Sequence, residues 1–440
     1  MSYIYSYQFN NERIPLLIDN MVDEGKNVFT VLIGENGTGK SRLLADMASK
    51  FTSKDNYYNH RSDSSRVIAA STSPFDIFPR SYGRNSRRGN YRYIGMKRSG
   101  PMTSSPLSLM SSAMLGILEK HINGESYDDL FHVFSALGFR PSLSLNYRSD
   151  FKFEKKIGIF DDNLNSLEKK LGLGIKHPYI NYINRNMTNP EDEEVVVHSF
   201  EVIRDFGFDF SSFSISFDLT SNEFHIKGKE SHIELKKSIY TLIKHGFIRL
   251  LDVKLDKLDT GTFSLRRASS GEQCMLLLML GIAGHISNNS IVLIDEPEIS
   301  LHPKWQESFM PLLMKVFNRY KSCQFIIASH SPQIVSNATS HNCFVTSISR
   351  NEIYEVSYFS NKSSDFQLAE LFNAPGNKNE YITRLCFGLL SRVKANRIVN
   401  DVDLESLNKI LSFTSILDNN DPLLDLIVSV KEVVDFYASN

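Results

Sequence analysis

A glycine-rich loop near the N-terminus constrains this chain more than any other feature. Residues 34–41 read Gly-Glu-Asn-Gly-Thr-Gly-Lys-Ser, between an apolar run, 28–33, and a stretch with a helical pattern, 42–48. A strand, a glycine-rich loop and a helix in this order form the context in which the pattern binds phosphate groups. The glycines let consecutive N–H groups curl around a phosphate chain, and the helix adds the positive end of its dipole. The loop therefore predicts a nucleotide-binding site.

Two residues of this loop have specific expected roles. We expect Lys40 to reach the β- and γ-phosphates and the Ser41 hydroxyl to hold Mg²⁺. No residue suggests itself for stacking on the base, so the choice between adenine and guanine stays open. The predicted nucleotide-binding residues here are Gly34, Glu35, Asn36, Gly37, Thr38, Gly39, Lys40, Ser41 and Arg42.

Length and composition place the chain among globular proteins of a reducing compartment. Its 440 residues suggest two or three domain-sized units, and the net charge of -1 means that any basic surface must be local. The four cysteines are scattered without a CxxC pair, which indicates neither a disulfide framework nor a zinc site. No apolar run approaches the roughly 18 residues that span a bilayer, and the N-terminus lacks a signal-peptide pattern. We expect a cytoplasmic protein without a membrane partner.

One local basic stretch does occur, at 80–98. It contains seven Lys and Arg residues and three Tyr residues but no acidic residue. Basic and aromatic side chains together suit a phosphate backbone and its bases, which makes nucleic-acid contact one reading. The other reading is a solvated loop whose arginines face water, a partner protein or the nucleotide.

The second half of the chain has a regular α/β rhythm. Helical patterns alternate with short apolar strands, of which 291–295 and 324–330 are the clearest. This alternation predicts a parallel sheet covered on both faces. The region from 107 to about 260 is first helical and then mixed, without sustained heptads, and 365–437 is mainly helical.

Three polar residues follow the two apolar strands. Asp295 ends one strand and can hold Mg²⁺, and Glu296 beside it can polarise an attacking water. A turn or a helix cap is the alternative reading of this pair. His330 closes the next strand, where ligands of open α/β sheets bind. A neutral imidazole there could bind the γ-phosphate or the water, although a structural role is the alternative.

A polar segment opens the apolar helix 271–286. Serine at the helix start and an acidic residue in the first turn are good N-terminal signals. The same free N–H groups and hydroxyls can bind a phosphate. The predicted site residues of this segment are Ser269, Ser270, Gly271, Glu272 and Gln273.

These stretches resemble, in the right order, the Walker A, signature, Walker B, D-loop and switch-histidine motifs of ABC-type ATPases. The form Glu-Pro-Glu-Ile-Ser-Leu-His-Pro at 296–303 is similar to the branch of RecF-, SMC- and OLD-like proteins. The resemblance implies an α/β ABC-type P-loop fold with a mixed, largely parallel sheet. It also implies two protomers around two ATP molecules, in which Ser269 and Gly271 contact the γ-phosphate held by the partner's Lys40. Glu296, His330 and Lys40 would be catalytic, and Ser41 and Asp295 would hold Mg²⁺.

The sequence departs from the family pattern at three places. Ala268 replaces the usual leucine before the signature serine, and His302 replaces the usual D-loop aspartate. No glutamine follows the short strand 66–70, so a Q-loop glutamine is missing and Ser73 or Asp76 is the candidate substitute.

The chain has no pattern of an added nuclease domain, because the helical tail is short and lacks a matching carboxylate cluster. It therefore resembles stand-alone antiphage-defence ATPases of the Septu, PARIS and retron-associated kinds. That resemblance implies a homodimer or larger homo-oligomer that hydrolyses ATP and regulates a separate nuclease or toxin. The alternatives are a DNA-maintenance ATPase that clamps DNA through 80–98, a transporter subunit and a nucleotide-binding protein without hydrolysis. The predicted domains are 1–100 and 261–360, the two parts of the ATPase domain; 101–260, an inserted helical and mixed region; and 361–440, a helical tail for partner docking.

Overall fold

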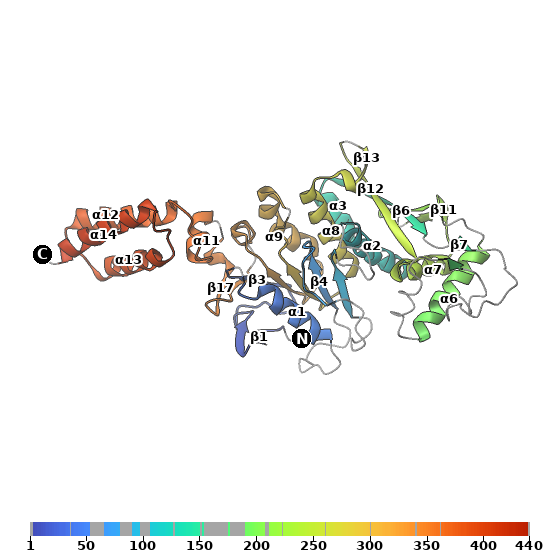
Figure 1. The fold of residues 1–440 in the computed structure, drawn as a ribbon, viewed down its shortest axis with the longest axis horizontal. Coiled ribbons are helices and arrows are strands. Elements are labelled where there is room, and N and C mark those ends of the chain that lie inside the picture. Colours follow the sequence, from blue (N-terminus) through green and yellow to red (C-terminus); the bar gives the residue numbers. More distant parts are fainter. Residues whose placement is uncertain are drawn as a thin grey trace.

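Three parts follow one another along the long axis of the molecule (Figure 1). They are the helical tail, a central sheet with helices on both faces, and a second sheet built from the inserted region. The predicted site residue Asn36 lies outside the described residues, as do 80–89 and 97–98 of the basic stretch. The computed structural model describes residues 3–35, 37–52, 66–79, 90–96, 106–125, 128–149, 152–153, 175–176, 190–206, 211–221, 223–259, 261–299, 301–338, 341–360 and 362–438.

The central sheet is seven-stranded and almost entirely parallel, with an antiparallel strand at one edge. Short apolar strands separated by helices produce this arrangement, because each strand is buried on both faces. Its order is β17 (Glu352–Glu355), β16 (Cys343–Ser347), β3 (Val28–Ile33), β15 (Gln324–Ala328), β14 (Ile291–Asp295), β4 (Val67–Ser71) and β5 (Tyr91–Ile94).

Alternate residues of these strands enter two different cores. Leu32 and Leu293 pack with α1 (Lys40–Thr52) on one face, together with the hairpin of β1 (Ser6–Phe9) and β2 (Glu12–Pro15). Val31 and Ile294 point to the other face, which α8 (Ser270–His285), α9 (Pro303–Phe317) and α10 (Pro332–Ser336) cover. The helix after the P-loop and the helix after the signature therefore lie on opposite faces of the sheet.

The inserted region forms a six-stranded antiparallel sheet, which is more regular than the mixed pattern of its sequence indicates. Its longest pair, β6 and β12, contains register shifts at two places, between Leu250 and Asp252 and between Leu255 and Lys257. These irregularities interrupt the polar–apolar alternation from which a strand is predicted. The sheet order is β11 (Lys229–Glu230), β10 (Glu223–Ile226), β9 (Phe213–Asp218), β6 (Phe139–Ser149), β12 (Ile248–Lys257) and β13 (Gly261–Ser264).

Helices join this second sheet to the ATPase core. They are α2 (Pro106–Ile122), α3 (Asp128–Ala136), α6 (Pro190–Asp205) and α7 (Ile233–Lys244). Two short strands, β7 (Lys152–Phe153) and β8 (Ile175–Lys176), form a separate pair, and the 3-10 turns are η1 (Leu265–Arg267), η2 (Val356–Tyr358) and η3 (Phe413–Ser415).

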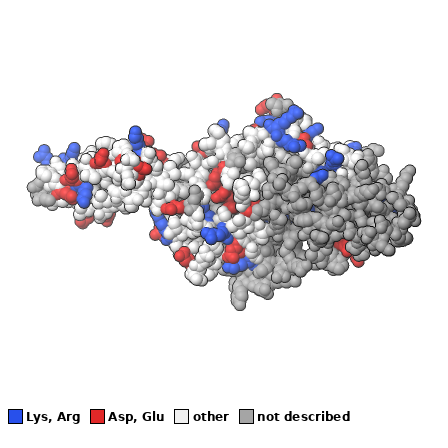
Figure 2. Space-filling view, in the orientation of Figure 1, with Lys and Arg blue, Asp and Glu red and all other residues white. Residues whose placement is uncertain are grey.

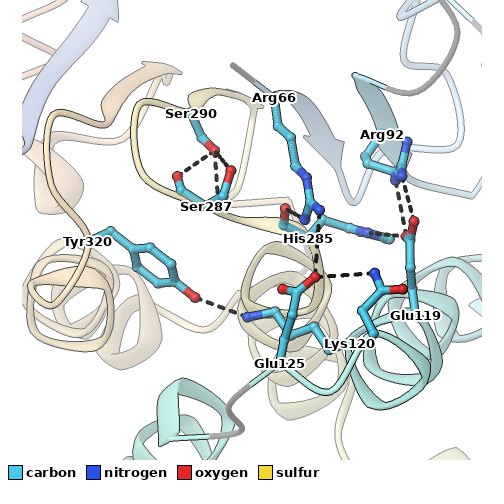
Figure 3. A network of polar contacts seen from close by, with 10 residues as sticks. Arg66, Arg92, Glu119, Lys120, Glu125, His285, Ser287, Ser290 and Tyr320 are labelled. Atoms are coloured by element: carbon cyan, nitrogen blue, oxygen red, sulfur yellow. Dashed lines mark hydrogen bonds and ion pairs between the residues drawn. The ribbon is translucent and has the colours of Figure 1, made fainter. Parts of the chain in front are cut away.

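Helices α2 and α8 cross closely, and a buried polar network ties their ends to the central sheet (Figure 3). A Cβ atom at Gly116 would lie 2.9 Å from the carbonyl carbon of Gly284, so only glycine permits this approach. Glu119 receives a 2.7 Å hydrogen bond from Arg92 of β5 and lies 3.6 Å from the ring of His285. Burial works against ionisation of Glu119, but His285 and Arg92 outweigh it and lower the pKa of Glu119 to about 2.

The tail has a hydrophobic core of its own, made by α12 (Glu380–Asn396), α13 (Asp401–Ser412) and α14 (Pro422–Ala438). By contrast, Leu371 and Phe372, which follow α11 (Ser364–Glu370), pack with the ATPase core. Acidic and basic side chains alternate over the tail in Figure 2, so this face of the tail carries no single-sign field.

The predicted fold class is confirmed: the protein is α/β, with a mixed, largely parallel sheet and a helical C-terminal tail. The domain boundaries drawn from the sequence stay predictions. Among the described helices, none is long and apolar enough to cross a membrane.

Candidate nucleotide site at the carboxyl edge of the sheet

The glycine-rich loop connects β3 to α1, as its sequence predicts. Gly37 and Gly39 have φ angles of 86° and 96°, which side chains with a Cβ rarely adopt. Lys40 is buried, and its Nζ donates to the carbonyl oxygens of Gly34 at 2.8 Å and Glu35 at 3.0 Å. Burial lowers the pKa of Lys40 to about 8, although nearby carboxylates oppose the shift. The ammonium is thus held by loop carbonyls that phosphate oxygens can replace.

Ser41 and Asp295 bring the two halves of the motif set together. Ser41 Oγ donates a 2.9 Å hydrogen bond to Asp295 Oδ1. Burial raises the pKa of Asp295 to about 7, and the charge of Glu296 adds to the shift while the bond from Ser41 opposes it. A carboxylate in this setting lacks a compensating cation.

The residues present fit Mg²⁺. A hydroxyl and a carboxylate oxygen are hard donors, and Mg²⁺ commonly takes only one or two ligands from the protein and the rest from phosphates and water. In keeping with this, the described part of the chain contains no cluster of three or more His, Cys, Asp or Glu side chains able to hold a metal alone. Ser41 and Asp295 are the residues that would hold the ion.

Glu296 and His330 lie together at the ends of the neighbouring strands β14 and β15. His330 Nε2 is 3.5 Å from Glu296 Oε1. Burial lowers the pKa of His330 to about 4, and the Lys40 cation adds to the shift, so the imidazole is neutral near pH 7. Glu296 has a φ of 47°, a backbone conformation that is strained for a residue with a side chain and is frequent at functional sites.

Glu298 joins this group and was missed by sequence reasoning about individual site residues. Its Oε1 accepts the main-chain N–H of His330 at 2.5 Å. A visible signal was present, because a second glutamate two residues after Glu296 follows the same proline turn.

The signature segment forms the N-terminus of α8. Ser269 is the N-cap: its Oγ accepts from the Glu272 N–H at 3.3 Å, and Glu272 Oε2 accepts from the Ser269 N–H at 3.2 Å. Gln273 donates from its side chain to the Ala268 carbonyl at 3.0 Å. Within the described residues, no hydrogen bond or ion pair joins 269–273 to the P-loop. One chain therefore brings together Lys40, Ser41, Asp295, Glu296 and His330 but leaves the signature exposed elsewhere.

The two candidate substitutes for the Q-loop glutamine are buried in the segment after β4. Asp76 accepts from Tyr93 Oη at 2.6 Å and from the Phe78 N–H at 3.1 Å, and Ser73 Oγ accepts from the Phe75 N–H at 3.2 Å. The charge of Asp76 also contributes to the raised pKa of Asp295. A role for either residue at the metal stays a prediction.

The described part of the basic stretch, 90–96, is engaged inside the protein. Tyr91 donates to the Pro79 carbonyl, Arg92 pairs with Glu119, and Tyr93 bonds to Asp76. These three side chains are therefore used for folding in this structure.

Comparison with known families decides the relationship of the chain. The profile of AAA_21, described as "AAA domain, putative AbiEii toxin, Type IV TA system", matches residues 117–336, which is half of the chain. The chain belongs to this AAA family. The match includes the signature, Asp295 and His330, and membership confirms the predicted resemblance to this branch of ATPases.

Two curated relatives of this AAA_21 chain carry related names. A stretch of 106 residues is 35% identical to "Retron Ec83 probable ATPase" of Escherichia coli and covers 22% of this chain and 19% of the relative. A stretch of 88 residues is 33% identical to "Retron Vc95 probable ATPase" of Vibrio cholerae serotype O1 biovar El Tor and covers 18% of this chain and 16% of the relative. The chain thus spans less than a fifth of the length of either relative.

Solved structures give only weak likenesses. The SMC head domain from Thermotoga maritima is 14% identical, with a TM-score of 0.20 over 34% of this chain and 70% of that chain. UvrA2 from Deinococcus radiodurans is 14% identical, with a TM-score of 0.21 over 76% of this chain and 33% of that chain. We base no conclusion on them, because TM-scores this low do not establish a shared fold.

Proposed function

We propose that this protein binds ATP with Mg²⁺ and hydrolyses it to ADP and phosphate. The observation that carries the proposal is the 2.9 Å contact between Ser41 and Asp295, which sets the two metal-binding residues face to face beside the P-loop. A hydroxyl from the loop and an aspartate from the neighbouring strand are the pair that holds Mg²⁺ in P-loop enzymes.

The chain's own residues account for the chemistry as positioning and electrostatics. Lys40 and the loop N–H groups bind the β- and γ-phosphates, and Mg²⁺ would neutralise charge that develops during transfer. Glu296 polarises the attacking water, and the neutral imidazole of His330 beside it orients the water or the γ-phosphate. The final three-residue arrangement of Lys40, Glu296 and His330 acts on one phosphoryl group.

The exposed signature supports a second step in the proposal, dimerisation around ATP. Ser269 and Ser270 are exposed at the N-terminus of α8, where free N–H groups favour an anion. Because α8 and α1 cover opposite faces of the sheet, a second copy can supply the segment that one chain leaves away from its own P-loop. Nucleotide state would then control assembly through differential binding.

We further propose that the ATPase regulates a separate nuclease or toxin in antiphage defence. Support comes from the names of the two retron relatives and from the tail, whose separate core offers a docking module beside the ATPase. A DNA clamp acting through 80–98 is the alternative, supported by the basic composition of that stretch.

The test uses a hydrolysis-blocked variant, Glu296→Gln, tagged and purified from the native host with ATP and Mg²⁺, then sized on a column. Glu307→Gln, an exposed change on α9, is the matched control. A stoichiometric nuclease or toxin in a dimer or larger assembly supports the proposal. A partner-free assembly that carries nucleic acid favours the DNA clamp. A monomer that does not respond to ATP contradicts both.

A further inference from the structure

Glu298 is a buried carboxylate for which the proposed hydrolysis has no role yet. It lies in a tight turn after β14, where the Ile299 N–H donates to the Glu296 carbonyl at 3.2 Å and the Leu301 N–H donates to the Glu298 carbonyl at 2.9 Å. From this turn the side chain reaches across to the loop after β15 and accepts the His330 N–H. The ends of two neighbouring strands are thus connected by one side chain.

The surroundings of this carboxylate are costly for a purely structural group. Oε2 of Glu298 is buried and has no hydrogen-bond partner among the described residues. A buried acceptor without a donor costs free energy rather than supplying it. Burial accordingly raises the pKa of Glu298, although the His330 N–H and the Ser329 hydroxyl oppose the shift.

The geometry explains what this costly group achieves. His330 is held at two points: its main-chain N–H by Glu298 Oε1, and its ring Nε2 beside Glu296 Oε1 at 3.5 Å. Both glutamates belong to the same turn, and the main chain of Glu296 is itself constrained, with a φ of 47°. The turn therefore determines where the imidazole lies relative to the carboxylate that polarises water.

We propose that Glu298 is a positioning residue, which holds the main chain of His330 so that the imidazole stays aligned with Glu296 for attack on the γ-phosphate. This inference rests on the proposed ATP hydrolysis. What matters is an acceptor oxygen at this distance from the turn, rather than the negative charge. Misplacement of a catalytic group by about 1 Å can cost on the order of 10²-fold in rate.

Three substitutions separate position from charge. Glu298→Gln keeps an acceptor oxygen at the same reach and removes the charge, Glu298→Asp keeps the charge and withdraws the oxygen by one methylene, and Glu298→Ala removes both. We expect kcat for ATP to fall by about 10- to 100-fold in the Asp and Ala variants and by less than about threefold in the Gln variant. The KM and the Kd for ATP should change by less than about threefold in all three, because Lys40 and the loop bind the phosphates.

Glu119→Gln is the control for loss of a buried carboxylate. Glu119 lies in the polar network of Figure 3, at the α2–α8 crossing, and pairs with Arg92. This variant should lower the Tm and leave kcat unchanged, whereas the Asp variant of Glu298 should lower kcat even where its Tm is higher than that of the control.

The outcomes are distinct. If the Asp variant keeps the wild-type kcat, or if the Gln variant loses as much as the Asp variant, positioning by Glu298 is wrong while ATP hydrolysis stands. If the Ala variant does not fold, the comparison of the Gln and Asp variants still decides. If the wild-type protein itself turns over no ATP, the proposed function fails first and this inference fails with it.

Discussion

Ser41 Oγ donates a hydrogen bond to Asp295 Oδ1 at 2.9 Å, although 254 positions separate the two residues in the chain. The contact joins the start of α1 to the end of β14 and lies beside the buried ammonium of Lys40. A metal ion placed between these two oxygens would replace their hydrogen bond. The pair thus distinguishes a phosphate-binding loop that acts with Mg²⁺ from one that only binds anions.

Ser41→Ala should make nucleotide binding insensitive to Mg²⁺. The variant loses the hydroxyl that would hold the ion, so ATP affinity with Mg²⁺ should fall at least about tenfold, while affinity in EDTA stays unchanged. Titration calorimetry with and without Mg²⁺ measures both. Ser49→Ala, on the exposed side of the same helix, should bind ATP as the wild type does. An equal loss in EDTA would mean that Ser41 acts on the loop and not on the metal.

Asp295→Asn should stabilise the nucleotide-free protein at high pH. Burial raises the pKa of Asp295 from 3.8 to about 7, so its contribution to stability is fully present below pH 3.8 and is lost as the pH rises through about 7. Above pH 7 the ionised side chain destabilises the fold, and asparagine removes that charge while keeping an acceptor for Ser41.

The measurement is thermal unfolding without Mg²⁺ and nucleotide at two pH values. At pH 8 the Asp295→Asn variant should have a Tm at least about 2 °C above that of the wild type, and the difference should be smaller at pH 5. A wild type that is the more stable protein at pH 8 would contradict the raised pKa.

Ser269→Ala should reduce both helix stability and ATP-dependent assembly. Loss of the N-cap hydroxyl costs about 1 kcal/mol, because the Glu272 N–H loses its acceptor. Assembly should also fail, because the same hydroxyl is the proposed contact with the partner's nucleotide. Ser363→Ala removes the N-cap of α11 and is the control, with a similar change in stability and normal ATP-dependent sizing on a column. Two variants with equal assembly would leave Ser269 as a cap only.

A chain ending at Gly376 should retain ATP hydrolysis and lose the effector. The core of α12–α14 is separate from the ATPase core, but Leu371 and Phe372 belong to the ATPase core and have to be kept. The boundary drawn from the sequence, at 361, would remove them. Steady-state hydrolysis within about twofold of the full chain is expected, since few core contacts cross the cut, and the pull-down should yield no partner. Loss of hydrolysis in a folded truncated chain would show that the tail acts on the nucleotide site.

Local features of the sequence were sufficient to predict each part of the site. The glycines and Lys40 define the loop because only a few residue types allow its backbone and bind phosphates. The apolar runs before Asp295 and His330 predicted buried parallel strands, and Ser269 with Glu272 predicted the start of α8. All of these signals depend on residues near one another in the chain.

Other features depend on which strands become neighbours, and a local pattern does not encode that. The order of β3, β15 and β14 in the sheet decides that Ser41 meets Asp295 and that Glu298 reaches His330. The antiparallel sheet of the inserted region escaped prediction because bulges in β12 break its alternation. By itself, the sequence determined the chemical groups of this site and their local backbone. Only the tertiary structure decided their distances, because strand pairing brings together residues hundreds of positions apart and burial then changes their pKa values.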